Sequence, residues 1–152
     1  MSTEAARIFC NEISSVRRAL FALPMEVAER SWRVGGWTGK QIVGHMLDSA
    51  ANNRQRFVRA GIDGSYAGPE YAQDAWIKAH GYEEKPWPTL LEWWSVEHEI
   101  LMAVVSSVPE ERLGAMCTVG EDAPVTLGFL IEDYLRHLRG HLRQLEGSAA
   151  GL

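Results

Sequence analysis

The sequence is poor in cysteine and has no long apolar run. Its 152 residues include only Cys10 and Cys117, whose spacing matches no metal-binding or redox motif, so we expect two free thiols. No segment approaches the roughly 18 apolar residues that a membrane helix needs, and residues 1–9 lack the apolar centre of a signal peptide. We therefore expect a cytoplasmic protein with no membrane partner.

An excess of positive charge is also missing. The formal net charge is −5 at pH 7, and a mildly acidic surface repels the phosphate backbone of nucleic acids. Arg54, Arg56 and Arg59 form the one basic run, and we interpret it as a solvated helix face rather than a binding patch. We expect no nucleic-acid partner.

The alternation of apolar and polar residues that marks β-strands is nearly absent. The exception is 116–119, where we expect a short extended segment. Hydrophobic residues make up 46% of the chain and charged residues 23%, as in an ordinary globular domain. Because the length suits one domain of usual size, we expect a single domain over 1–152.

Four segments instead carry apolar residues at alternating steps of three and four, the pattern of helices that bury one stripe. The first holds the stripe from Phe9 to Leu23 and ends before Pro24. The second is expected at about 38–60, with a stop at Gly61, and the third from after Pro88 to before Pro109. The fourth is expected at 126–146, with a stop at Gly147 and a frayed end over 147–152. Capping-box patterns, Thr38 with Gln41 and Thr89 with Glu92, mark two of the helix starts. The sequence predicts an all-α four-helix bundle.

The connection between the second and third predicted helices, 61–87, is too long to be a bare loop in a compact domain. We expect a short helix within it at 71–80. We interpret its aromatic residues as anchors of a packed loop rather than as ligand contacts. They are Tyr71, Trp76, Tyr82 and Trp87.

Trp93 and Trp94 are neighbours in a predicted helix, so their side chains point about 100° apart. One of them needs a second surface to cover it. The long connection or a second subunit would supply that surface, and we expect a homodimer.

Histidine carries the strongest indication of chemistry. His137 and His141 stand four residues apart, which places both rings on one helix face. His45 lies on the inner side of the second predicted helix, and a bundle can bring it beside the other two. Three imidazoles leave open positions on a metal ion, as in a catalytic site. Leu138 occupies the position of the glutamate in an HExxH protease motif, which disfavours that activity.

A second set of residues is placed near these histidines by helix geometry alone. A carboxylate or carbonyl that accepts the free ring N–H of a metal ligand fixes its tautomer. For one member, His98, we favour a core histidine with satisfied hydrogen bonds over a fourth ligand. No catalytic acid or base is evident. The candidates are Asp48, Asn52, Glu97, His98 and Tyr134.

Three stretches of sequence resemble the DinB/YfiT-like superfamily. They are GWTGKQIVGHMLDSAANNRQRF at 36–57, YAQDAWI at 71–77 and TLGFLIEDYLRHLRGHLRQL at 126–145. The resemblance implies a four-helix bundle that binds one divalent ion, commonly nickel, zinc, iron or manganese, and the ligands carry over as His45, His137 and His141. Gly140 stands where many relatives have a further histidine, and we interpret it as a close approach of a neighbouring helix.

The same resemblance implies a range of activities. Characterised branches include S-transferases that use bacillithiol or mycothiol and a mycothiol-dependent isomerase. We expect a metal-dependent transferase that joins a low-molecular-weight cellular thiol to a small electrophilic substrate. A metal-dependent hydrolase and a non-catalytic metal-binding or stress-response bundle are the alternatives.

Overall fold

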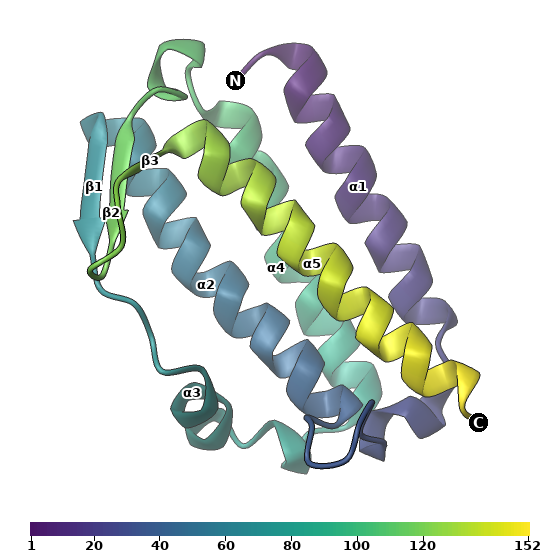
Figure 1. The fold of residues 1–152 in the computed structure, drawn as a ribbon. Helices are drawn as coiled ribbons and strands as arrows, with labels where there is room; N and C mark the ends of the chain where they lie inside the picture. The colour runs from purple at the N-terminus through teal and green to yellow at the C-terminus, as the bar shows by residue number, and fades with distance from the viewer.

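Four long helices form a bundle in the computed structural model, which describes all of residues 1–152 (Figure 1). They are α1 (Thr3–Ala22), α2 (Gly39–Asp63), α4 (Trp87–Ser107) and α5 (Leu127–Ala150). α2 packs against both α4 and α5, and α1 packs against the same two helices from the other side. The predicted all-α four-helix bundle is confirmed, and the contact of α2 with α5 brings the histidine-bearing helices together.

The predicted apolar stripes form the core of this bundle. Nearly all of their members are buried, because each stripe faces the interior of the bundle. The buried members are Phe9, Ile13, Val16 and Leu20 on α1, Ile42, Met46, Ala50 and Phe57 on α2, Leu90, Trp94 and Leu101 on α4 with Val108 just beyond it, and Leu127, Ile131, Tyr134, Leu138 and Leu145 on α5.

The predicted start of α2 is confirmed and its predicted end is wrong. The Thr38 hydroxyl accepts from the Gln41 backbone N–H, and the Gln41 side chain accepts from the Thr38 N–H. The helix continues through Gly61 to Asp63, because Gly64, in the left-handed conformation with φ of 81°, provides the stop.

The predicted boundaries of α4 and α5 also need correction. Pro86 precedes α4, which begins at Trp87 without a side-chain cap, so Thr89 lies inside the first turn and forms no capping box. α5 passes through Gly147 and ends at Ala150. Its last turn stays ordered because the Ser148 side chain is buried and Arg30 donates to the Gly151 carbonyl.

The long connection after α2 contains a strand and a helix. Strand β1 (Ser65–Gly68) pairs in parallel with β2 (Met116–Val119), the expected extended segment, and β2 pairs antiparallel with β3 (Val125–Thr126). The predicted short helix is α3 (Gln73–His80). The sheet lies beside one end of α2 and α3 beside the other (Figure 1), so the connection runs along the length of α2.

Short 3-10 turns complete the fold. They are η1 (Met25–Glu29), η2 (Tyr82–Glu84) and η3 (Glu110–Arg112). One of them, η2, packs the long connection onto α2. Tyr82 and Trp87 are buried, as expected of loop anchors. Trp94 is in the core, whereas the Trp93 ring lies 5.8 Å from that of Tyr82 and 6.5 Å from that of His80. The long connection therefore provides the second surface that Trp93 needs.

Cys10 and Cys117 are both free thiols and form no disulfide. None of the helices combines the length and the apolarity required to cross a membrane.

Candidate metal centre

His45 is the most buried of the three candidate ligands. It lies in the first third of α2 and is 5% exposed. Its ring centroid is 4.7 Å from that of His141 and 4.8 Å from that of Trp37. The His45 Nδ1 atom is buried and has no hydrogen-bond partner. Because a buried polar atom without a partner is destabilising, this atom is the clearest sign of a missing ligand.

Partners on α5 orient the other two imidazoles. His141 Nδ1 lies 3.0 Å from the Gln144 side-chain oxygen, and His137 Nδ1 lies 3.0 Å from the Asp133 carbonyl oxygen. An Asp133 carboxylate oxygen is also 3.3 Å from His137 Nδ1. These oxygens can only accept, so each Nδ1 carries the proton and each Nε2 keeps a lone pair for a metal ion.

Burial keeps the inner imidazoles neutral. The pKa of His45 falls to about 4, first because burial disfavours the charged ring and then because His141 and His137 repel it. Burial likewise lowers the pKa of His141, against a raising effect of its hydrogen bond to Gln144. Since a histidine binds a metal ion only in its neutral form, both rings are ready to do so at neutral pH.

The three histidines share one region without forming a closed cluster. No three His, Cys, Asp or Glu side chains have the mutual spacing of a formed metal site. His137, with a side chain 60% exposed, lies at the rim and lines the same cavity as His45. The unpartnered nitrogen of His45 and the free Nε2 atoms fit a divalent ion. The three-histidine ligand set stays a prediction.

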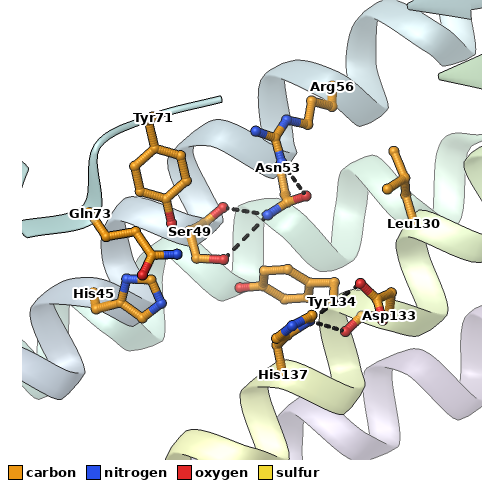
Figure 2. Close-up of a pocket in the computed structure, with 10 residues that line it drawn as sticks. All are labelled: His45, Ser49, Asn53, Arg56, Tyr71, Gln73, Leu130, Asp133, Tyr134 and His137. Carbon is orange, nitrogen blue, oxygen red and sulfur yellow. Dashed lines mark hydrogen bonds and ion pairs between the residues drawn. The ribbon is translucent and has the colours of Figure 1, made fainter. Parts of the chain in front are cut away.

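The cavity between α2 and α5 has a volume of about 160 Å³ and is mostly polar. Figure 2 shows its side chains converging from α2, from α5 and from the segment that leads into the first residue of α3. It is lined by His45, Ser49, Asn53, Arg56, Tyr71, Gln73, Leu130, Asp133, Tyr134 and His137. An opening of this kind gives a small molecule access to the histidines.

Two of the five residues predicted to support the ligands form a buried pair beside the cavity. Tyr134 lines the cavity, and its hydroxyl lies 2.6 Å from His98 Nε2. His98 Nδ1 donates to the Trp94 carbonyl at 2.8 Å, so Tyr134 donates to Nε2. Burial lowers the pKa of His98 to about 4. His98 is thus a core histidine with both ring nitrogens in use.

The other three predicted residues lie outside the cavity and bond none of the three histidines. Asp48 accepts from the Tyr82 hydroxyl at 2.6 Å, and the same carboxylate oxygen lies 3.0 Å from His80 Nδ1. Asn52 donates to the Asp48 carbonyl oxygen, and Glu97 pairs with Arg54 at 3.0 Å. The ligand rings are oriented instead by Asp133 and Gln144.

Several cavity residues were missed by the sequence analysis although periodicity contained a signal. Ser49, Asn53 and Arg56 follow His45 on α2 at steps of four, four and three, so they share its face. Tyr71 and Gln73 come from the long connection, whose path no local pattern predicts. Tyr71 contributes to the cavity wall, so describing it only as a loop anchor was incomplete.

Two other interpretations of the sequence are wrong. Gly140 does not mark a close helix approach, because a Cβ there would meet only Arg143 of the same helix, at 3.8 Å. The run of arginines is not a uniformly solvated face: Arg54 is ion-paired, and Arg56 is buried with 9% exposure.

A helical bundle with a polar, histidine-lined cavity between two of its long helices defines a class of protein suited to hold a divalent ion. The chain belongs to the DinB superfamily, whose family model matches residues 13–145. That match covers the helices that carry all three histidines. No curated protein matches the sequence.

Solved structures share the fold at low sequence identity. YfiT from Bacillus subtilis superposes with a TM-score of 0.83 at 19% identity, over 96% of this chain and 86% of YfiT. It is described as a probable metal-dependent hydrolase with an unusual four-helix bundle topology. The mycothiol-dependent maleylpyruvate isomerase superposes with a TM-score of 0.76 at 16% identity, over 95% of this chain and 63% of the isomerase. These likenesses establish the fold.

Proposed function

We propose that this protein holds one divalent transition-metal ion, nickel, zinc, iron or manganese, on His45, His137 and His141, and that it transfers a small electrophile to a low-molecular-weight thiol. The observation that carries the proposal is the buried, partnerless Nδ1 of His45, beside His141 and at a cavity that also contains His137. The descriptions of YfiT as metal-dependent and of the isomerase as thiol-dependent support it.

The chain's own residues hold the site in shape. Asp133 and Gln144 orient two of the imidazoles, and the Trp37 ring covers His45. The Trp37 indole N–H donates to Asp74 at 3.0 Å, which ties this cover to α3. A bound divalent ion would supply one thing, the stabilisation of a thiolate at neutral pH.

The covalent step needs no further protein base. The thiolate sulfur attacks the electrophilic carbon, a C–S bond forms, and the leaving group departs with the electron pair of the broken bond. The proton of the thiol has already gone to solvent. The cavity residues bind and orient the two reactants and keep them close together.

Hydrolysis is the second candidate, favoured by the description of YfiT. A bound ion would lower the pKa of a water molecule to about 7, and a neighbouring general base would assist removal of its proton during the attack. Asp133 is the one carboxylate that lines the cavity, and it is held by Arg136 and His137. Because no other carboxylate of the cavity is free to assist an attacking water, we favour the thiol as the nucleophile.

An activity screen separates the candidates. Metal-loaded protein is assayed with several cellular thiols and generic electrophiles, beside His45→Ala and the control His80→Ala, which removes a histidine that does not line the cavity. We expect thiol-dependent turnover that is lost in His45→Ala and kept in His80→Ala. Turnover without thiol would support hydrolysis. No rate above that of His45→Ala in any assay would contradict both and leave a non-catalytic metal-binding bundle.

A further inference from the structure

Arg56 is a buried cation without a counter-ion in the protein. It is 9% exposed, and it forms no ion pair with any carboxylate. Its one side-chain hydrogen bond is from Nη1 to the Asn53 side-chain oxygen, at 3.4 Å. Burying a charge without an opposite charge is destabilising, so this guanidinium is poised to gain from an anionic ligand.

The free part of this guanidinium faces the candidate metal centre's cavity. Arg56 lines that cavity together with His45 and His137. Figure 2 shows its side chain extending from α2 toward Asn53 and the side of Tyr71. The Nε and Nη2 atoms of Arg56 have no hydrogen-bond partner in the protein, and solvent reaches both of them. Both nitrogens therefore remain available to a ligand.

Nearby carboxylates do not occupy this position. A second hollow of about 410 Å³ shares Arg56 and Asp133 with this cavity, and its lining also includes Glu70 and Asp122. Asp133 is paired with Arg136 and His137, and neither Glu70 nor Asp122 reaches ion-pair distance of Arg56. The acidic rim leaves the inner guanidinium as the one unpaired charge of the cavity.

We propose that Arg56 binds the carboxylate of the small molecule that reaches the histidines. A planar guanidinium with two free nitrogens matches a carboxylate in a bidentate arrangement. His45 and Arg56 are about three helical turns apart on one face of α2, so the ligand is elongated, with its reactive end at the imidazoles and its carboxylate at Arg56. This inference rests on the proposed function for the histidine end.

Binding measurements with matched thiols test this subsite. Cobalt-loaded protein is titrated with mercaptohexanoate and mercaptooctanoate, and with the corresponding mercaptoalcohols, by calorimetry and by the thiolate-to-cobalt absorption band. We expect the acid of one chain length to bind about tenfold tighter than its alcohol or more. Arg56→Gln removes that preference, so that the acid and its alcohol bind with similar affinity, and Arg56→Lys restores part of the preference. Arg59→Gln, on the exposed side of α2, keeps the preference.

A second arm identifies which reactant carries the carboxylate. Hexanoate is titrated into the same proteins in the presence of saturating mercaptoethanol. Arg56-dependent hexanoate binding would assign the carboxylate to the electrophile, whereas a preference for the mercapto-acids alone would assign it to the thiol. Either result supports the subsite.

A third arm separates this inference from the proposed function. Hexanoate is titrated into protein stripped with chelator, in wild type and Arg56→Gln. If the protein binds no metal but hexanoate binding still depends on Arg56, the proposed function fails and the subsite stands. The subsite is overturned if the mercapto-acids bind no tighter than the mercaptoalcohols and hexanoate does not bind. It is also overturned if Arg56→Gln and Arg59→Gln weaken acid binding to the same extent. Circular dichroism checks that each variant is folded.

Discussion

At the residue scale, the environment of each histidine decides its role, and the sequence reveals that environment only in part. The spacing of His137 and His141 predicts that their rings share a face, and the structure has both on the side of α5 that faces α2. The partners of these rings, Asp133 and Gln144, lie four and three residues away. Periodicity allows those contacts, but the rotamers that make them depend on packing between helices, which a single sequence does not contain.

His98 gives a pH-dependent prediction. Its folded pKa is about 4 and its ordinary pKa about 6.5, so the unfolded chain takes up the proton first. Stability from this residue is fully present above about pH 6.5 and is lost as pH falls toward 4, with a slope of at most about 1.4 kcal/mol per pH unit. His98→Gln should flatten the pH dependence of the free energy of unfolding, measured in urea on metal-free protein.

His45 also has a lowered pKa, but it is present in both proteins and contributes equally to each. The difference between the two pH profiles therefore isolates His98. Identical profiles between pH 4 and 7 would show that His98 is not buried in its neutral form.

At the element scale, apolar periodicity predicts the helices well, and cap signals predict their ends unevenly. The Thr38 capping box forms because a turn precedes it and leaves its backbone N–H free for Gln41. The similar pattern at Thr89 fails, because α4 has already begun at Trp87 after Pro86. Strand β1 has only four residues, and its pairing with β2 is too distant in sequence for a local pattern to predict.

Gly44 and Gly147 form a matched pair of helix glycines. A Cβ atom at Gly44 would overlap the Tyr82 ring, whereas one at Gly147 would meet nothing within 4 Å. We expect Gly44→Ala to destabilise the protein by about 1–3 kcal/mol through overpacking and Gly147→Ala to stabilise it by about 0.5–1 kcal/mol. Chemical denaturation of both variants measures this. An equal stabilisation by the two substitutions would contradict the close packing of η2 on α2.

At the scale of the whole molecule, the exposed apolar face of α4 favours self-association. Trp93, Val96 and Ile100 lie along one side of this helix, and Trp93 is 41% exposed even after packing against the long connection. Exposed apolar stripes of this kind are typical of interfaces. We predict a homodimer, which size-exclusion chromatography with light scattering would detect. Val96→Glu should weaken the dimer. A mass of 17.0 kDa for the wild type, that of one chain, would contradict the prediction.

The arrangement of the molecule as a whole explains why the cavity was harder to predict than the bundle. The bundle follows from stripes that each lie within one segment. The cavity needs α2, α5 and the segment that leads into α3 together. The lining residues outside α2, such as Tyr71, have no shared spacing with His45. The family resemblance predicts that the three histidines are ligands, but it predicts no role for Arg56.

The central claim is that His45, His137 and His141 bind one divalent ion together. The most direct measurement is calorimetric titration of chelator-stripped protein with nickel and zinc, for wild type, for each single His→Ala variant and for His80→Ala. We predict about one ion per chain for wild type and His80→Ala, and a large loss of affinity for each of the other three variants. Binding that is unchanged in those three variants, or no binding by wild type, would contradict the account.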